Sequence, residues 1–305
     1  MNRKSSTLKK LYLQRQRILI CITSPTPSAA KIIEDAGFEY TYVSGGVTGS
    51  TLLGMPDNGT ISLTEFLWMA KLIVDAVNIP VVADVDACFG GIFHVQRAIK
   101  ELISIGVAGV RIEDQPVVGK RFGGMAGKEV IPLKDAVAKY RVAVDTRYDL
   151  DPDFQIVARC EALGASNSKG LPEAIDRLQA YKQAGVDVLH LEGPRSVEEI
   201  MAVRAAVEGP LTANFHALKE DLTPEDALSL GLCEARYPRL LSAAMATAGR
   251  ALLSEFREKG YAAVTEFYEK FPGSINNRGA EADWQKSLRD MEEKYLDSEA
   301  LTKYQ

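Results

Sequence analysis

Cysteine, histidine and long apolar segments are all scarce in this 305-residue sequence. The four cysteines form no Cys-x-x-Cys pair, which argues against a zinc site or a disulfide framework and suits reduced thiols. They are Cys21, Cys88, Cys160 and Cys233. No stretch approaches the roughly 18 apolar residues of a membrane-spanning helix, and residues 1–17 lack the apolar centre of a secretory signal. We therefore expect a cytoplasmic protein with no membrane partner.

A basic excess is also missing. Lysine and arginine number 36 against 41 aspartates and glutamates, so the net charge is −5. Because nucleic acids and anionic membranes require a basic face, this balance argues against both as partners. The remaining composition, 46% hydrophobic and 25% charged, is that of a globular protein with a sizeable core. The length permits two domains, although a single α/β barrel commonly uses about 250 residues.

Short β-branched segments alternate with segments of helical periodicity from residue 18 to about residue 258. The predicted strands are Ile18–Ile22, Tyr40–Ser44, Pro80–Asp84, Gly109–Glu113, Gln155–Arg159, Val186–Glu192, Pro210–Asn214 and Ala235–Pro238. The predicted helices are Ser28–Ala36, Leu63–Ala76, His94–Ile105, Lys134–Asp145, Pro172–Ala184, Val197–Val207, Pro224–Leu230 and Leu240–Lys259. Such alternation requires parallel strands joined by right-handed crossovers. Eight units favour a (β/α)8 TIM-type barrel over residues 1–258, with a doubly wound sheet as the alternative.

The pattern changes after about Lys259. Residues 259–305 are charged and helical, with aromatic side chains at intervals. These are Tyr261, Phe267, Tyr268, Phe271, Trp284 and Tyr295. Because so many aromatic side chains need a surface on which to be buried, we predict a C-terminal helical extension that packs on the barrel or on a partner subunit. The alternative is a loosely ordered terminus.

Polar residues gather where the predicted strands end, which is where barrel enzymes place their active sites. Seven of the eight strands end this way: Ser44-Gly45-Gly46, Asp84-Val85-Asp86, Glu113-Asp114, Arg159-Cys160-Glu161, Glu192, Asn214 and Tyr237. Side chains alternate along a strand. If the strand geometry continues past the strand ends, the side chains of three pairs therefore point in the same direction: Asp84 with Asp86, Arg159 with Glu161, and His190 with Glu192. The sequence thus predicts an active site at this end of the barrel.

Asp84, Asp86 and Glu113 are expected to form an acidic cluster at the mouth. Like charges at close range raise one another's pKa unless a cation lies among them. A cluster of carboxylate oxygens that leaves room for water and substrate suits Mg²⁺, or Mn²⁺, better than a soft metal. The alternative is an ion-pair network in which the cluster is neutralised by Lys120, Arg121 or Arg159.

Opposite the cluster, Arg159 can bind a carboxylate through two hydrogen bonds. The Ser44 hydroxyl and neighbouring backbone N–H groups can hold an oxyanion. Metal, arginine and oxyanion donors together favour an enolate next to a carboxylate, hence a 2-oxo or 2-hydroxy carboxylate substrate. Other chemistries fit less well: Gly45–Gly49 matches neither a GxGxxG fingerprint nor a P-loop, and no strand carries an isolated lysine for a Schiff base.

The order and spacing of these motifs resemble the isocitrate lyase / phosphoenolpyruvate mutase superfamily, from roughly Leu11 to Leu253. The matching segments are Tyr42-Val-Ser-Gly-Gly, Leu53-Gly-Met-Pro-Asp57, Asp84-Val-Asp86, Phe89-Gly90, Ile112-Glu-Asp-Gln115, Lys120-Arg121-Phe-Gly-Gly-Met-Ala-Gly-Lys-Glu129, Val157-Ala-Arg159-Cys-Glu161, Glu192, Ala213-Asn214 and Tyr237-Pro238. The resemblance implies a barrel enzyme whose Mg²⁺ is held, directly or through water, by Asp84, Asp86 and Glu113.

The same resemblance assigns further roles. Substrate binding falls to Tyr42, Ser44, Gly45, Gly46, Asp57, Arg159 and Asn214. Catalysis falls to Arg159, Glu113, Glu192, Lys120 and Arg121. The segment Gln115–Pro132 would be a mobile gating loop over the mouth, rich in glycine at positions 119, 123, 124 and 127. The resemblance also implies a homotetramer or homodimer in which C-terminal helices are exchanged between subunits.

The gating loop departs from the family pattern. In the carbon–carbon lyases it reads Lys-Lys/Arg-Cys-Gly-His, and the cysteine donates a proton during cleavage. Here Phe122 and Gly124 stand at the cysteine and histidine positions. Because phenylalanine has no transferable proton, decarboxylation of an oxaloacetate-like substrate, protonated by water, fits this loop better than cleavage of a methylisocitrate-like one. The alternative is that Phe122 enlarges the apolar wall for a bulkier, alkylmalate-like substrate.

Two other functions remain open from the sequence. One is a phosphonopyruvate-type mutase or hydrolase. Glu192 counts against this function, because the phosphonopyruvate enzymes favour histidine at that position. The other is a catalytically silent barrel that binds or assembles, which Phe122 favours and the retained acidic cluster opposes.

Overall fold

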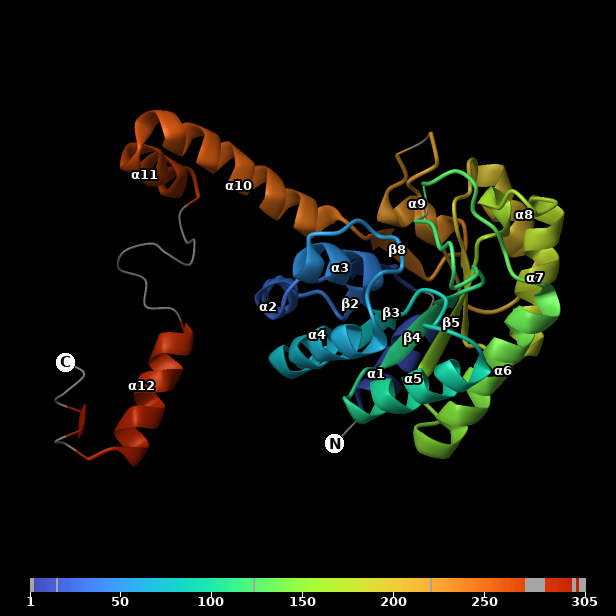
Figure 1. Ribbon diagram of the computed structural model, residues 1–305, viewed down its shortest axis with the longest axis horizontal. Coiled ribbons are helices and arrows are strands. Elements are labelled where there is room, and N and C mark those ends of the chain that lie inside the picture. Colours follow the sequence, from blue (N-terminus) through green and yellow to red (C-terminus); the bar gives the residue numbers. More distant parts are fainter. Residues whose placement is uncertain are drawn as a thin grey trace. The chain divides into compact units, whose positions relative to one another are not determined.

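The computed structural model describes residues 3–14, 16–122, 124–219, 221–271, 283–297 and 300–301. The chain divides into two compact units, residues 1–243 and 244–305. The first contains eight parallel strands (Figure 1). They are β1 Leu19–Ile22, β2 Thr41–Ser44, β3 Val81–Asp84, β4 Gly109–Glu113, β5 Gln155–Cys160, β6 Val188–Leu191, β7 Leu211–Ala213 and β8 Glu234–Tyr237.

The strands form a nearly closed barrel. Their hydrogen-bonded order is β1-β8-β7-β6-β5-β4-β3-β2. An isolated parallel bridge between Thr23 and Tyr42 then links β1 to β2. A doubly wound sheet would leave β1 inside an open sheet, whereas here β1 pairs with β8 from Leu19–Glu234 to Ile22–Tyr237. The predicted (β/α)8 fold is therefore confirmed.

Helices surround the strands, close to the bounds that periodicity predicts (Figure 1). They are α2 Pro27–Asp35, α4 Leu63–Ala76, α5 Ile92–Ser104, α6 Leu133–Leu150, α7 Leu171–Gln183, α8 Val197–Ala206 and α9 Pro224–Ser229, with a 3₁₀ turn at Ala162–Gly164. α4 illustrates why they form. The Ser62 and Glu65 side chains cap its start reciprocally, and its apolar residues, spaced by three or four, are buried against the sheet.

Two helices were not predicted. α1, Lys4–Leu13, lies in a segment that reads as basic and polar, yet Leu8 and Tyr12 are buried with the inner residues of the strands. α3, Gly45–Leu53, follows β2 directly and contains three glycines. The Ser44 side chain caps α3, and Gly54 ends it in the left-handed conformation, φ +64°. Local capping therefore outweighs the weak helix propensity of glycine.

The barrel interior below the strand ends is charged as well as apolar. Arg111 on β4 and Arg236 on β8 are both buried and both pair with Glu234, at 3.3 and 2.9 Å. The ring of Tyr42 lies 5.2 Å from the Arg111 guanidinium carbon and 4.3 Å from that of Arg236. These contacts tie β2, β4 and β8 together directly beneath the residues at the mouth.

The second unit is helical. It contains most of α10, Leu240–Lys259, together with α11, Tyr261–Lys270, and α12, Asp283–Tyr295. The division falls inside α10 rather than at residue 258, and no side chain of α10 is buried. Phe267 of α11 packs on Tyr268 and Phe271 at ring-centroid distances of 6.0 and 4.9 Å. The side chain of Trp284 lies outside the described residues. No helix in the described part of the chain is both long and apolar enough to cross a membrane.

Candidate active site

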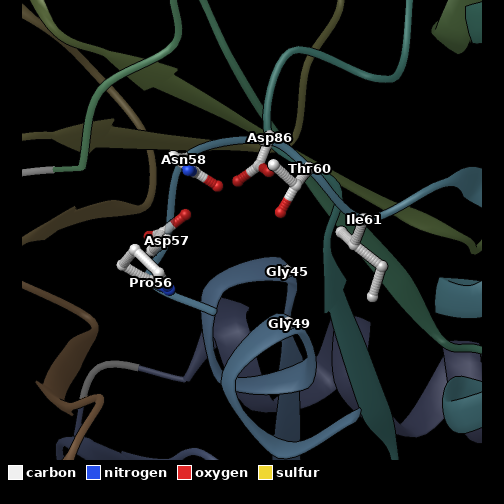
Figure 2. A pocket seen from close by; sticks show the side chains of 9 residues that line it. Gly45, Gly49, Pro56, Asp57, Asn58, Thr60, Ile61 and Asp86 are labelled. Carbon is white, nitrogen blue, oxygen red and sulfur yellow. The ribbon is translucent and has the colours of Figure 1, made fainter. Parts of the chain in front are cut away.

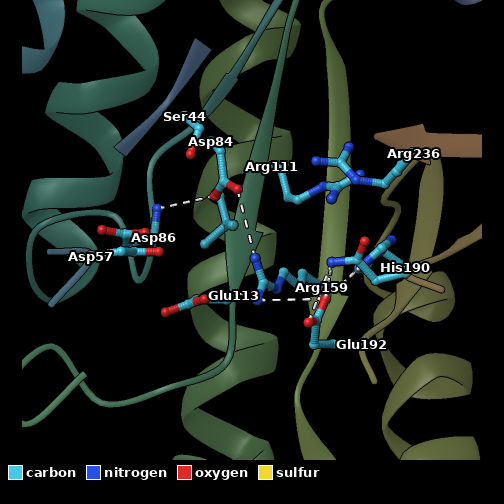
Figure 3. A network of polar contacts seen from close by, with 12 residues as sticks. Ser44, Asp57, Asp84, Asp86, Arg111, Glu113, Arg159, His190, Glu192 and Arg236 are labelled. Carbon is cyan, nitrogen blue, oxygen red and sulfur yellow. Dashed lines mark hydrogen bonds and ion pairs between the residues drawn. The ribbon is translucent and has the colours of Figure 1, made fainter. Parts of the chain in front are cut away.

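The carboxyl ends of β2 to β7 bring most of the predicted site residues together (Figure 3). Ser44, Asp84, Glu113 and Arg159 end or nearly end their strands. Ser44 pairs with Asp84 across β2 and β3, and Glu113 pairs with Arg159 across β4 and β5. Parallel pairing thus brings residues that are distant in the sequence together at the mouth of the barrel.

The N-terminus of α3 forms one wall of this mouth. The Ser44 hydroxyl accepts a 3.5 Å hydrogen bond from the Val47 N–H, which starts the helix. A Cβ added to Gly45 would lie 3.0 Å from an Asp86 carboxylate oxygen, and one added to Gly46 would lie 2.4 Å from the Asp57 carboxyl carbon. Only glycine therefore lets the first turn of α3, with its free N–H groups and positive dipole end, approach these carboxylates.

Asp84 and Asp86 are separated by a change in backbone conformation. β3 ends at Asp84, and Asp86 has φ +50°, followed by Cys88 at +63° and Phe89 at +58°. The strand alternation therefore does not continue to Asp86. Left-handed non-glycine residues are strained, so the surrounding structure must hold this turn and the Asp86 carboxylate that it carries.

Burial makes the acidic cluster electrostatically unusual. Burial raises the pKa of Asp86 to about 6, with Lys120 acting in the opposite direction and Asp57 and Asp84 adding to the rise. Burial also raises the pKa of Glu113 well above its usual range, against the influence of Arg159. One Glu113 oxygen, Oε1, accepts from the Gln115 amide at 3.0 Å. The other, Oε2, is buried and has no hydrogen-bond partner.

The gating loop reaches the cluster through Lys120. Its ammonium contacts the Asp57 carboxylate and lies 3.0 Å from Asp86 Oδ1. Although burial lowers the pKa of Lys120, the charges of Asp86, Glu113 and Asp57 together raise it above its ordinary value. The predicted ion-pair network is therefore present on this side. The hollow between α3, Asp57 and Asp86 is too small to hold a substrate (Figure 2).

Arg159 is the hub of the other half of the site (Figure 3). Its guanidinium nitrogens lie 2.5 Å from Glu161, 3.5 Å from Glu192, 3.7 Å from Asp84 and 3.8 Å from Glu113. Arg159 and Glu161 thus face one another, as strand alternation predicts. The Arg159 Nε is buried and has no hydrogen-bond partner. One edge of the guanidinium is therefore left for another acceptor.

Glu192, just after β6, is held from several directions. Its carboxylate accepts from the Asn214 amide at 3.1 Å and lies 3.1 Å from His190 Nε2. Burial alone would raise its pKa, but Arg159 and His190 hold the pKa of Glu192 well below its usual range. His216, which is exposed, lies 3.8 Å from the same carboxylate. The Glu192 carboxylate lies 3.5 Å from Arg159, so it orients the guanidinium.

Some predicted residues lie elsewhere. Tyr42 is fully buried beneath the mouth, between the two guanidinium groups of the barrel interior. Arg121 contributes its backbone: its N–H and carbonyl both bond the Gln115 side chain, at 3.1 and 2.9 Å. Phe122 is 42% exposed and Gly124 is exposed on the loop. Gly123 lies outside the described residues.

Two residues of the site received no role from the sequence. The Gln115 amide donates both to Glu113 and to the Arg121 carbonyl in the gating loop. Lys128, at the far end of the loop, pairs with buried Glu161. Both lie inside matched motifs, but motif membership does not show which side chain turns inward. The role of Lys128 could have been predicted from its positive charge, because it lies in a loop expected to face an acidic site.

The donor set fits a divalent cation. Among the described residues no three His, Cys, Asp or Glu side chains already surround a common point. However, the unpartnered Glu113 Oε2 is a buried, hard oxygen acceptor, and Asp84 and Asp86 lie beside it. Carboxylate oxygens of this kind are preferred ligands of Mg²⁺ and Mn²⁺. Asp84, Asp86 and Glu113 therefore suit a hard cation.

Comparisons with known proteins agree with this geometry. Residues 8–257 match the sequence model of the family described as phosphoenolpyruvate phosphomutase. The 2,3-dimethylmalate lyase of Eubacterium barkeri is 36% identical over 203 residues, which cover 67% of this chain and 68% of that protein.

Two solved structures share the fold. An oxaloacetate acetylhydrolase in complex with the inhibitor 3,3-difluorooxalacetate has a TM-score of 0.78 and 31% identity, covering 85% of this chain and 89% of the other. A phosphonopyruvate hydrolase complex with oxalate and Mg²⁺ has a TM-score of 0.80 and 25% identity, covering 97% and 100%. This chain is therefore an enzyme of the phosphoenolpyruvate phosphomutase family, within the isocitrate lyase / phosphoenolpyruvate mutase superfamily that its motifs predicted.

Proposed function

We propose that this protein is a Mg²⁺-dependent carbon–carbon lyase or decarboxylase that acts on a 2-oxo or 2-hydroxy di- or tricarboxylate through a pyruvate-type enolate. One observation carries the proposal. In the mouth, Arg159 Nε and Glu113 Oε2 form an ion pair at 3.8 Å, but both atoms are buried and neither has a hydrogen-bond partner. A substrate carboxylate would satisfy the first and a hard cation the second.

Different groups of the protein would contact different parts of the substrate. Arg159, oriented by Glu192 and Glu161, binds the substrate carboxylate through its free edge. The Ser44 hydroxyl and the first free N–H groups of α3 donate to the oxygen on which negative charge develops. Such donors at a helix N-terminus are fixed before reaction, so they stabilise that charge without reorganising.

Asp84, Asp86 and Glu113 would hold the metal, and Asp57 would lie at the mouth. A bound Mg²⁺, or Mn²⁺, would polarise the substrate oxygen as a Lewis acid. Asp86 would then exchange its contact with Lys120 for one with the cation. The relative crystallised with oxalate and Mg²⁺ supports this choice of metal and of ligand class.

The chemistry follows from what the loop lacks. When the bond between a 2-oxo dicarboxylate and its departing carboxylate breaks, carbon dioxide leaves and the electron pair of the broken bond remains in the enolate. Water then supplies the proton, so Phe122 in place of a cysteine does not block decarboxylation. For a 2-hydroxy substrate, the hydroxyl proton would pass to a carboxylate beside Arg159 as the carbon–carbon bond breaks. One fragment would then leave with a carbonyl, and water would protonate the enolate of the other. The relatives named for dimethylmalate and oxaloacetate favour this substrate range.

We also propose that the enzyme is a homotetramer or homodimer. α10 has no buried side chain, and its apolar residues Leu253 and Phe256 are 66% and 44% exposed. A 20-residue helix with apolar side chains left in water is a surface for a second copy. Light scattering after size-exclusion chromatography should give a multiple of 33.3 kDa, and the change Leu253→Glu should shift it toward the monomer mass.

The decisive test follows four compounds by ¹H and ³¹P NMR: oxaloacetate, 2-methylisocitrate, 2,3-dimethylmalate and phosphonopyruvate, each with Mg²⁺. We expect EDTA-sensitive loss of one of the first three, abolished by Asp84→Ala. The matched control is Asp149→Ala, an exposed carboxylate on α6 outside the site. A changed phosphorus signal would favour phosphonate chemistry instead. If all four compounds stayed intact, a silent barrel would be the better description.

A further inference from the structure

A second cavity lies outside the acidic cluster, between the two stems of the gating loop and the starts of α5 and α6. Its volume is about 560 Å³, within the range of small-molecule sites. Gly90–Ile92 line it beside α5, Gln115–Val118 and Ile131–Pro132 line it from the loop stems, and Asp135, Ala138 and Lys139 line it from α6. The mouth described above uses none of these residues except Gln115.

The wall is mostly apolar but contains one buried cation. Lys139 is only 7% exposed, and its ammonium donates to the Ala87 carbonyl. No ion pair of Lys139 exists among the described residues, and Asp135 on the same wall is exposed to solvent. Burial lowers the pKa of Lys139, only partly opposed by Cys88, Glu113 and Asp114. A buried ammonium without an ion-pair partner favours an anion, whereas Ile92, Val117 and Ile131 favour an aliphatic body.

The cavity touches the active site at two points. Lys139 bonds the carbonyl of Ala87, inside the strained turn that carries Asp86. Such strain persists only where neighbouring contacts hold the backbone. Gln115 lines the cavity and also bonds Glu113 and the backbone of Arg121 in the gating loop. A molecule in the cavity would therefore contact both the Asp86 turn and the loop stems.

We propose that this cavity binds a small free carboxylate with a short aliphatic chain, and that occupancy changes the position of the gating loop. The carboxylate pairs with Lys139 and competes with the Ala87 carbonyl for its ammonium. The aliphatic chain packs between the loop stems, against Val117 and Ile131. This site is separate from the proposed catalytic function and does not depend on it.

Isothermal titration calorimetry with hexanoate tests the binding step, with Mg²⁺ and oxalate at saturation to occupy the catalytic mouth. We expect hexanoate to bind, and hexan-1-ol and hexylammonium to bind at least tenfold more weakly. Lys139→Met should weaken hexanoate binding at least tenfold. The matched control is Lys134→Met, the same change at an exposed position of the same helix, which should alter it less than twofold. If Lys139→Met failed to fold, Ala138→Trp would decide the matter, because it fills the cavity from an exposed position.

Trypsin cleavage after Lys120 and Arg121 tests the coupling. Hexanoate should change the cleavage rate at least threefold in the wild-type protein and not in Lys139→Met. The proposal is overturned if hexanoate does not bind, if it binds Lys139→Met or Ala138→Trp as well as the wild type, or if oxalate displaces it. Binding with no change in cleavage would overturn the link to the gating loop.

Discussion

Gly46 offers the sharpest test of how the site is built. A methyl group at this position would place its carbon 2.4 Å from Asp57 Cγ and 2.5 Å from Asp57 Oδ2. Ordinary contact begins near 3.4 Å, so in Gly46→Ala the carboxylate must retreat by about 1 Å. That movement pulls Asp57 off Lys120, which connects the gating loop to the acidic cluster. A displacement of this size in a catalytic arrangement costs about 100-fold in rate, or about 2.7 kcal/mol of transition-state stabilisation.

Folding stability should respond differently. Alanine is favoured over glycine in a helix by about 0.5–1 kcal/mol. The Asp57 side chain is 37% exposed, so losing its ion pair costs at most about 1 kcal/mol. These two effects offset, but displacing Asp57, whose Cβ would lie 2.7 Å from the added carbon, has a cost of its own. We therefore expect the free energy of unfolding of Gly46→Ala to fall by about 1–3 kcal/mol. Activity is lost without the fold being lost.

Gly49→Ala is the matched control, because it makes the same change in the same helix. A Cβ there meets nothing within 4 Å, so only the helix gain of about 0.5–1 kcal/mol applies. We expect a slightly higher melting temperature and a kcat/KM within about threefold of the wild type. The assay follows substrate loss by ¹H NMR beside urea unfolding by circular dichroism. Gly46→Ala with full activity, or the two variants with equal losses, would refute the inferred role of the close approach.

Three further outcomes are expected. Burial, followed by the charge of Arg111, holds the pKa of His190 well below its usual value, so the folded state keeps the ring neutral while the unfolded state binds a proton near pH 6.5. Stability should therefore fall below that pH by up to about 1.4 kcal/mol per unit, and urea titrations of His190→Asn from pH 7.5 to 5 should lack that part of the slope. Lys128→Met removes one of the two cations that contact buried Glu161 and leaves Arg159 in place. It should cost about 1–3 kcal/mol of unfolding free energy, which the added change Glu161→Gln should partly restore. Mg²⁺ at 100 times its Kd should stabilise the protein by about 2.7 kcal/mol in calorimetry, and a similar stabilisation of Asp86→Asn would contradict its role as a metal ligand.

Local pattern was enough to place the strands and most of the helices. Most strands of the barrel are short segments that contain β-branched residues, and each strand was predicted within a few residues. α1 and α3 were missed for different reasons. α1 depends on the burial of Leu8 and Tyr12 against strands far along the chain, and α3 on the cap that Ser44 provides at a strand end.

The composition of the site was also readable in advance. Barrel topology sends strand ends to one face, so the acidic cluster and Arg159 could be predicted as neighbours from their positions alone. Their detailed contacts could not. The strand geometry stops at Asp84, so the direction of Asp86 depends on a strained turn that no periodicity encodes.

The sequence by itself therefore determined the fold class, the family, and which residue types gather at the mouth, because periodicity and motif spacing are properties of the chain. Only the tertiary structure decided that Tyr42 is buried beneath the site, that Lys120 enters the acidic cluster, and that one oxygen of Glu113 and one nitrogen of Arg159 have no hydrogen-bond partner. Those facts depend on burial and on which side chains compete for each partner. Both are set by packing between segments that the sequence keeps apart.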